Sequence, residues 1–360
     1  MVLLPFDNFS GVQDAPQQIS SLIEKTLASK GWRVAPSDQT EKILTADRVR
    51  YLDSIDPAVI AKLLEAGSAE ALVSGTIYTY SDGRNAVVAI SARMIRADGT
   101  LAWSDLAASS SDDTEKILGF GKQTSARGVA SSTIATLMRR FPAAGAQSGP
   151  VRGRSKGFLQ SPPASFRAKD FDNSSQKVCV LPFDNVSAVP EAARVVTDVV
   201  ALRLAAVEGF DVVEPEQLRS AALKARIGSF RGIGSDDLVK LASAVGTPLF
   251  IRGTVYDFVD PVARGAGEPE LQIELSLIDV RSGRVLWAAQ HGRKGSDYVG
   301  FLMLGKVSNT VSLTDRVVSE MIDAELRAAR RSPGPSKAAG ATKSRVAENH
   351  SELQKKAGEK

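Results

Sequence analysis

The 360-residue sequence has little of the chemistry on which many enzymes depend. Its single cysteine, Cys179, excludes an internal disulfide and any zinc site built from several cysteines. Its two histidines, His291 and His350, belong to no HExxH pair, no Ser-His-Asp arrangement and no GxSxG nucleophile elbow. The sequence therefore predicts a protein that is not an enzyme, with no catalytic residue, no metal ligand and no cofactor site.

The sequence also lacks a long apolar run, because no stretch approaches the roughly 20 residues that a membrane-spanning helix needs. Hydrophobic residues make up 43% of the chain and charged residues 24%, which is typical of globular proteins. A chain of 360 residues is long enough for two domains, each with its own core. We therefore expect a soluble, two-domain protein, in which Cys179 within VCVLPF is a buried core residue.

The net charge of +4 does not lie on a folded surface. Residues 142–177 contain six Lys or Arg against two Asp or Glu, and residues 331–360 contain seven against three, so each segment carries +4 and the rest of the chain carries −4. Both segments have few apolar residues and no periodicity. They are predicted to be a flexible basic linker and a disordered basic tail, with only Phe158 and Phe166 suggesting local docking of the linker.

A motif of five residues, LPFDN, occurs at residues 4–8 and again at 181–185, and the regions that follow align with each other. The spacing of an amphipathic helix occurs in both regions at an offset of 177, at Ile19, Leu22, Ile23 and Leu27 and at Val196, Val199, Val200 and Leu204. A glycine follows each helix, Gly31 and Gly209, where a left-handed cap is expected. The chain therefore contains two copies of one pattern.

The later parts of the two copies align as strands and a final helix. ALVSGTIYTY and PLFIRGTVYDF match through Gly75 and Gly253 and through Tyr78 and Tyr256. The strand that follows alternates apolar and polar residues, and a tight hairpin then leads to a tryptophan in each copy. Each copy predicts the order β-α-β-α-α-β-β-β-α, a mixed sheet packed by helices, with domains at residues 1–141 and 178–330.

These motifs together resemble the CsgG-like group, which includes the curli-secretion lipoprotein, the penicillin-binding-protein activator lipoproteins and the N-terminal domain of TolB. The resemblance rests on LPFDN before an amphipathic helix, WRVAP and FDVVEP, the GTIY and GTVY strands, the hairpin to tryptophan and a late GK, over Val2–Phe141 and Val178–Leu326. It implies two tandem three-layer α/β domains, similar to anticodon-binding domains. It also implies a non-enzymatic binding or assembly module, usually located in the cell envelope.

Two departures from the group qualify that expectation. The connections SDGRN and VDPVARGAGEPE are too short for the hairpins of a membrane pore, whose strands take ~9–11 residues each. No leader and no lipid-acceptor cysteine stand before Met1. We therefore expect a periplasmic or outer-membrane-associated protein if a leader precedes this chain, and a cytoplasmic one otherwise.

A second candidate motif is GFLMLGKV, which contains the G-x-x-x-x-G-K of a phosphate-binding loop at Gly300 to Lys306. Val307 stands where that loop needs Ser or Thr to ligate Mg²⁺, and the first copy has EKILGFGKQ with Lys116 in place of the first glycine. A turn before the last helix is the favoured interpretation. Nucleotide binding remains the weakest of three hypotheses.

Other polar and aromatic residues are interpreted as structural. Asp7-Asn8 and Asp184-Asn185 are expected to organise the turn into the first helix of each copy. GSFRGIG at residues 228–234 is expected to be a loop. The aromatic residues expected to pack within and across strands are Tyr78, Tyr80, Tyr256 and Phe258. An exposed stacking platform for single-stranded nucleic acid is the alternative interpretation of these four.

The leading hypothesis is an envelope interaction module that binds protein partners of unknown identity. The alternative is a nucleic-acid-binding protein with anticodon-binding-like domains, although no specific nucleic acid is expected from a mildly acidic body. The basic segments leave contact with lipid headgroups open, and the oligomeric state is open as well. Function should lie where the copies differ: residues 259–270, the segment around His291, the linker and the tail.

Overall fold

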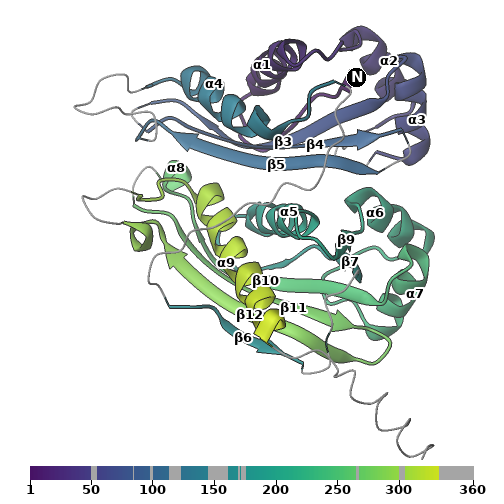
Figure 1. Ribbon diagram of the computed structural model, residues 1–360, viewed down its shortest axis with the longest axis vertical. Coiled ribbons are helices and arrows are strands. Elements are labelled where there is room, and N and C mark those ends of the chain that lie inside the picture. Colours follow the sequence, from purple (N-terminus) through teal and green to yellow (C-terminus); the bar gives the residue numbers. More distant parts are fainter. Residues whose placement is uncertain are drawn as a thin grey trace, which may run out of the picture.

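The computed structural model describes residues 1–49, 55–83, 85–97, 100–112, 123–144, 161–168, 171, 176–264, 267–299 and 305–331. The chain forms two mixed β-sheets, each packed by helices, which confirms the predicted two-domain α/β fold (Figure 1). Within these ranges, no helix combines the length and the apolar character needed to cross a membrane.

The first sheet has five strands in the order β1-β3-β4-β5, with β2 also paired to β3. The strands are β1 (Val2–Leu3), β2 (Asp7–Asn8), β3 (Ala71–Ser81), β4 (Val87–Arg96) and β5 (Leu101–Ser110). The helices are α1 (Ala15–Ser29), α2 (Ser37–Ala46), α3 (Pro57–Ala66) and α4 (Ala126–Leu137), extended by the 3-10 turn η4 (Met138–Arg140). Strands β1 and β2 run parallel to β3, and β4 and β5 continue the sheet antiparallel.

The second sheet has seven strands in the order β6-β12-β11-β10-β7-β9, with β8 also paired to β10. The strands are β6 (Ala164–Arg167), β7 (Gln176–Val180), β8 (Asp184–Asn185), β9 (Phe210–Val212), β10 (Leu249–Val259), β11 (Glu270–Asp279) and β12 (Arg284–Lys294). The helices are α5 (Ala192–Ala205), α6 (Pro215–Lys224), α7 (Ser235–Val245), α8 (Pro261–Arg264) and α9 (Thr310–Arg331), with the 3-10 turn η5 (Gly295–Tyr298).

Helices pack on both faces of each sheet, so each copy has three layers. On one of the two faces, however, the helices (α2 and α3, or α6 and α7) cover only one end of the sheet (Figure 1). In the second copy, Val178 and Val180 of β7 face the core beneath α5 and α9. Cys179 and Leu181 face the opposite core beneath α6 and α7. The alternation of side chains along a strand therefore supplies two cores from one strand. Burial raises the pKa of the Cys179 thiol to about 12, as expected for an inert core cysteine.

The LPFDN motif is a strand interrupted by its proline. Pro5 has no N–H to donate, yet the chain pairs with β3 on both sides of it, as β1 and then as β2. The first core strand therefore resumes at Asp7-Asn8 instead of ending at LPF. Asn8 also shapes the turn that follows, because its Oδ1 accepts from the backbone N–H of Ser10 at 3.1 Å, and Asn185 repeats this bond with Ser187 at 3.0 Å.

The predicted linker contains a strand that its composition does not reveal. Residues 164–167 form β6, which pairs antiparallel with β12 and extends the second sheet. Phe166 remains 54% exposed, so the segment is held by backbone bonds and by the ion pair of Arg167 with Glu325 on α9. An edge strand offers unpaired backbone groups to any nearby segment, whatever its hydrophobic pattern.

The two copies also differ in one predicted strand. The FDVVEP segment of the second copy contains β9, which pairs with β7. The WRVAP segment of the first copy exchanges only two bonds with Met1, from Met1 N to Arg33 O at 2.9 Å and from Ala35 N to Met1 O at 2.8 Å. It is therefore not a strand, and the predicted element order holds fully only in the second copy.

Candidate functional site at the sheet faces

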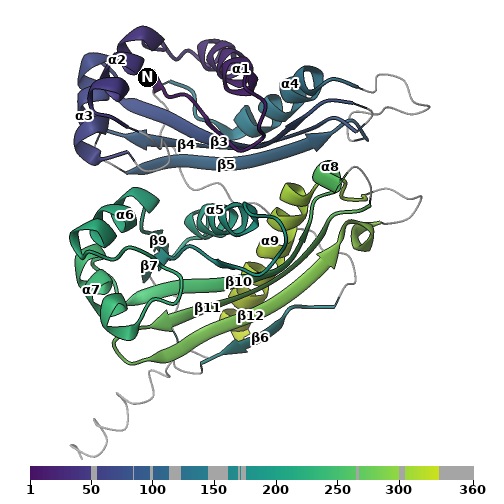
Figure 2. The same cartoon turned by 180° about the vertical axis from the view of Figure 1, so that it is seen from behind.

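The two copies stack so that α5 and α9 lie between the two sheets (Figures 1 and 2). The face of the first sheet that meets these helices is called the docking face here. Its residues are Ser74, Thr76, Tyr78, Ala89, Ser91, Arg93, Ser104, Leu106 and Ala108. Tyr78 and Ala89 belong to the same buried cluster as α5 and α9, so the core of the second copy continues into the first.

Each copy presents a tyrosine on this face by means of a β-bulge. Tyr78 is the extra residue where the pairing of β3 with β4 shifts between Ile77 and Thr79, and Tyr256 is the extra residue at the matching shift in β10. A bulge places two successive side chains on the same side of a sheet and can redirect one of them. Tyr78 therefore contacts the second copy, whereas Tyr80 faces α1 and donates to Gln18.

Tyr78 is a polar anchor of the docking face. Its hydroxyl donates to Asp198 Oδ2 on α5 at 3.1 Å and lies 3.0 Å from Ser91 Oγ. The side chain is only 7% exposed, and its burial, with the charge of Asp198 second, raises the pKa of Tyr78 well above its ordinary value. The phenol therefore stays neutral and acts as a hydrogen-bond donor between the copies.

Arg93 of β4 is a second polar anchor. Its Nε donates to Ser74 Oγ at 3.1 Å, its Nη1 pairs with Glu214 Oε2 at 3.2 Å, and its Nη2 pairs with Glu216. Both carboxylates stand at the start of α6 in the second copy. Burial alone would lower the pKa of Arg93, but the two carboxylates raise it, so the guanidinium remains charged. A cavity of about 90 Å³ remains beside this ion pair.

Glu214 carries an unusual titration because burial raises its pKa to about 7, against the opposing effect of Arg93. The ordinary value is 4.5, so the folded protein binds this proton more tightly than the unfolded chain does. Protonation of Glu214 therefore stabilises the fold in full when the pH is below the pKa of the unfolded chain. This stabilisation is lost as the pH rises through the pKa of the folded protein. The other charged groups around Glu214 are Arg93, Glu216 and Asp211, none of which reverses this direction.

We therefore expect the free energy of unfolding to fall by about 1–3 kcal/mol between about pH 5 and about pH 8 through Glu214. Urea denaturation at a series of pH values measures this dependence. A Glu214→Gln variant, which cannot ionise, serves as the control and should show a flatter profile than the parent protein. Identical profiles for parent and variant would contradict the assignment.

The second sheet has an equivalent face, called the open face here. No helix in the described ranges packs on it beyond the end that α6 and α7 cover. Its residues are Arg252, Thr254, Tyr256, Gln272, Glu274, Ser276, Ala288 and Gln290, all of which are exposed or half-buried. Tyr256 is 37% exposed, whereas its counterpart Tyr78 is 7% exposed. The same device, a bulged tyrosine, thus serves an internal interface in one copy and faces solvent in the other.

Like the docking face, the open face has an arginine next to its tyrosine. On the docking face Ser74 pairs across the strands with Arg93, and on the open face Arg252 pairs with Ser276, so the same rung carries Arg and Ser with the strands exchanged. In the part of the chain that the structure describes, the side chain of Arg252 makes neither an ion pair nor a hydrogen bond. Glu274 occupies the place of Ser91 and accepts from the Tyr256 hydroxyl at 2.8 Å.

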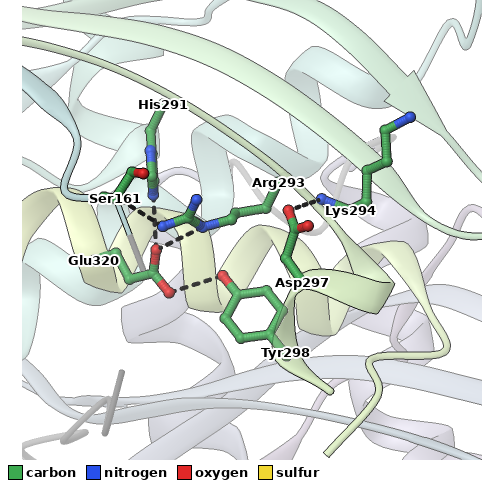
Figure 3. Close-up of polar contacts among 7 residues, drawn as sticks. All are labelled: Ser161, His291, Arg293, Lys294, Asp297, Tyr298 and Glu320. Atoms are coloured by element: carbon green, nitrogen blue, oxygen red, sulfur yellow. Dashed lines mark hydrogen bonds and ion pairs between the residues drawn. The ribbon is translucent and has the colours of Figure 1, made fainter. Parts of the chain in front are cut away.

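The segment around His291, which differs between the copies, forms a buried polar cluster (Figure 3). Glu320 of α9 lies 2.7 Å from His291 Nε2 and accepts from Arg293 Nε at 3.3 Å and from the Tyr298 hydroxyl at 2.8 Å. Burial alone would raise the pKa of Glu320, but these partners lower it. Arg293 also donates to Ser161 O at 2.6 Å.

This cluster fastens β12 and η5 to α9, and it holds the segment before β6. The first copy has Ala107 and Thr136 at the positions of His291 and Glu320, so the cluster is specific to the second copy. Because its polar groups bind one another, we interpret it as a structural fastening.

Residues 259–270, the longer connection of the second copy, contain α8 and line a cleft of about 230 Å³ against the first copy. Two carboxylates in the cleft accept hydrogen bonds from backbone N–H groups. Asp82 accepts from Ala126 N at 2.6 Å, and Glu268 accepts from Ser296 N at 2.9 Å. The described ranges contain no group of three or more His, Cys, Asp or Glu residues arranged to hold a metal ion.

The remaining candidates are placed only in part. Most of the GFLMLGK motif, residues 300–304, lies outside the described residues, as do its first-copy counterpart at 113–122, Phe158 and the tail from residue 332. Val307, which follows the motif, is buried and donates its N–H to Gly295 O at 3.1 Å. The GSFRGIG segment is a loop between α6 and α7, as predicted.

The four candidate aromatic residues do not form one platform. Tyr78, Tyr80 and Phe258 are buried in the interface or in the cores, and Tyr256 alone is exposed. The sequence pattern did not identify four residues of these faces, because their contacts depend on which strands and helices meet. They are Asp198, Glu214, Arg93 and Arg252. The aligned tyrosines were the one sequence signal that pointed to these faces.

No protein-family model and no curated protein matches the chain. Among solved structures, the PelC dodecamer from Paraburkholderia phytofirmans is 15% identical over 44% of this chain and 93% of PelC, with a TM-score of 0.30. The C-terminal domain of LpoB from Salmonella enterica is 16% identical over 33% of this chain and 83% of that chain, with a TM-score of 0.27. TolB from Acinetobacter baumannii is 18% identical over 37% of this chain and 27% of TolB, with a TM-score of 0.22. These similarities are weak, and the function is argued from the faces themselves.

Proposed function

We propose that this protein is a non-enzymatic interaction module of the bacterial cell envelope, which binds a protein partner through the open face of its second sheet. The observation that supports the proposal is the duplicated, bulged tyrosine. In the first copy it anchors the contact between the two copies of the chain, and in the second it is exposed beside Arg252, whose side chain has no partner among the described residues. Tyrosine and arginine are the residues most often found at the energetic centres of such contacts.

The envelope location and the domain limits, residues 1–141 and 178–330, rest on the sequence. The motif order resembles the CsgG-like group, whose members are usually envelope proteins, and this resemblance supports a periplasmic or outer-membrane-associated position. The nucleic-acid alternative has less support, because three of its four aromatic residues are buried and its basic charge lies in the linker and tail.

We expect a photo-reactive phenylalanine analogue at position 256 to cross-link one discrete protein in intact cells. The same analogue at Val239 is the control, because Val239 is also exposed but lies on α7 and not on the strands of the open face. Purified partner should then bind the Tyr256→Ala variant about tenfold or more weakly than the parent protein, with unchanged thermal stability of the variant.

A partner that cross-links equally from positions 256 and 239, or that binds the Tyr256→Ala variant with undiminished affinity, would place the binding surface elsewhere. The cross-link reports proximity, and the affinity measurement reports energy. The proposal requires both results.

A further inference from the structure

We infer that the open face binds an α-helix of its partner, with a carboxylate of that helix on Arg252 and a basic side chain about two turns away on Glu274 and Tyr256. This inference rests on the proposed function and specifies the chemistry of the partner. It is argued from the internal precedent of the docking face, from the polar groups of the open face and from their spacing.

The precedent is that the docking face already binds helices with acidic residues. Its tyrosine binds Asp198 on α5, and its arginine binds Glu214 and Glu216 at the start of α6. Between these anchors, α5 presents the small and apolar residues Ala201, Leu202 and Ala205. A face with this layout therefore accepts a helix with an apolar stripe and an acid, and its arginine accepts acids from a neighbouring element.

On the open face, the positive charge of Arg252 calls for a carboxylate partner, as that of Arg93 does on the docking face. Its guanidinium has five donors and a permanent charge, and in the described part of the chain it has no carboxylate to bind. Its neighbour across the strands is Ser276, which cannot neutralise it. A carboxylate supplied by a partner is the complementary group.

The tyrosine of the open face, in contrast, requires a hydrogen-bond donor or a positive charge from the partner. Tyr256 gives its hydroxyl hydrogen to Glu274, so its oxygen is left as an acceptor, and Glu274 adds a negative charge. Tyr78, in contrast, gives its hydrogen to an acid of the other copy. A partner residue beside Tyr256 must therefore donate hydrogen bonds, and a Lys or Arg would also neutralise Glu274.

The distance between Arg252 and Tyr256 matches the spacing of side chains along one face of a helix. Arg252 and Tyr256 are four residues apart on one bulged strand, roughly 10–13 Å at the rise of a β-strand. Two turns of an α-helix span about 10.8 Å, which separates residues i and i+7 on one face. Thr254 lies between the two anchors on β10, and Ala288 lies on β12 in the same rung as Arg252 and Ser276. Both side chains are small and leave room for an apolar helix stripe, as α5 has on the docking face.

A second copy of this chain is a poorer occupant. Its equivalent helix, α1, carries Glu24 and Lys25 where α5 has Ala201 and Leu202, so charged residues replace the apolar stripe. Within Ala15–Ser29 the only acid and the only base are these two neighbours, which point in different directions and are not two turns apart. A second copy stacked on the open face would therefore offer neither an apolar helix stripe nor charges at the spacing of Arg252 and Tyr256.

The test uses the full chain and fluorescent helical peptides of about 20 residues, built on Ala, Leu and Gln. One peptide carries Glu and Lys at i and i+7, a second carries Lys at both positions, and a third carries Gln at both. We expect the Glu/Lys peptide to bind about tenfold more tightly than the other two by fluorescence anisotropy, with weaker binding at high salt.

Charge reversal makes the test specific. The Arg252→Glu variant should lose its preference for the Glu/Lys peptide and prefer the Lys/Lys peptide, because it then presents two carboxylates. Arg231→Glu is the matched control, since Arg231 is exposed on the 228–234 loop and its reversal changes the net charge equally. The control should retain the original preference.

Equal binding of all three peptides, binding of none, or loss of preference in both variants would overturn the inference. So would self-association in the analytical ultracentrifuge that Arg252→Glu abolishes, because the occupant would then be a second copy. The proposed function fails separately, if Tyr256→Ala leaves the affinity for the native partner unchanged.

Discussion

Replacement of Gly253 by alanine is expected to unfold the second copy under conditions in which the parent protein is folded. A Cβ atom at Gly253 would stand 2.3 Å from the ring of Phe183 and 2.4 Å from the backbone oxygen of Glu274. The ring belongs to the second LPFDN motif, and the oxygen belongs to the neighbouring strand β11. Neither can move without breaking the core or the sheet, so we expect a loss of at least about 3 kcal/mol.

The first copy should behave in the same way, because Gly75 packs against Phe6 with 2.2 Å left for a Cβ. The close packing of this glycine on the phenylalanine of LPFDN explains why both motifs recur in each copy: a larger residue at the glycine position would collide with the phenylalanine ring. Thermal and urea denaturation followed by circular dichroism measure the effect, which should lower the midpoint by roughly 6–12 °C.

Gly228→Ala is the control for both substitutions, because Gly228 lies in the loop before α7 and a Cβ there would meet open space. Its effect should stay within about 0.5 kcal/mol. If Gly253→Ala lowers stability by no more than the control does, the close contact between Phe183 and β10 is not a constraint on the fold.

Replacement of Arg93 by alanine is expected to separate the two copies. The substitution would leave Glu214 and Glu216 without the guanidinium that binds them, in an interface where their side chains are only 16% and 6% exposed. Removing one partner of a buried ion pair costs about 3–5 kcal/mol, because the remaining charge must be solvated. Undocking of the copies is the way in which water can reach these carboxylates.

Scanning calorimetry should therefore show two separate transitions for Arg93→Ala in place of a coupled one, and limited proteolysis should cut between the copies faster. Arg93→Lys should give an intermediate result, since lysine keeps the charge but not the two-pronged donor geometry. Arg252→Ala is the matched control on the open face, where the same residue type has no partner in the described part of the chain. Unchanged cooperativity in Arg93→Ala would show that the remaining contacts hold the copies together without this ion pair.

Most of the core could be predicted from the sequence because it depends on periodicity. The stripe of Ile19, Ile23 and Leu27 on α1 is fully buried, and Leu271, Ile273, Leu275 and Leu277 of β11 all point into the core. A side chain repeats its direction every two residues in a strand and about every 3.6 in a helix, so a local pattern is sufficient. The duplicated LPFDN, GTIY and GTVY motifs then predicted two copies of one fold.

The candidate faces could not be predicted in this way, because burial of a face depends on what lies across from it. Tyr78 and Tyr256 have the same motif and the same bulge, but α5 covers only the first. The arginine of each face changes strands, from β4 at Arg93 to β10 at Arg252, and only the cross-strand register shows that the two positions match.

By itself, the sequence determined the repeated elements, their order and the inward side of each strand, since these follow from spacing along the chain. The tertiary structure alone decided three other features. It added β6 from the predicted linker to the second sheet, it placed the acids of α5 and α6 against Tyr78 and Arg93, and it left Arg252 and Tyr256 on an open face. These features arise from contacts between residues far apart in sequence, which no local pattern records.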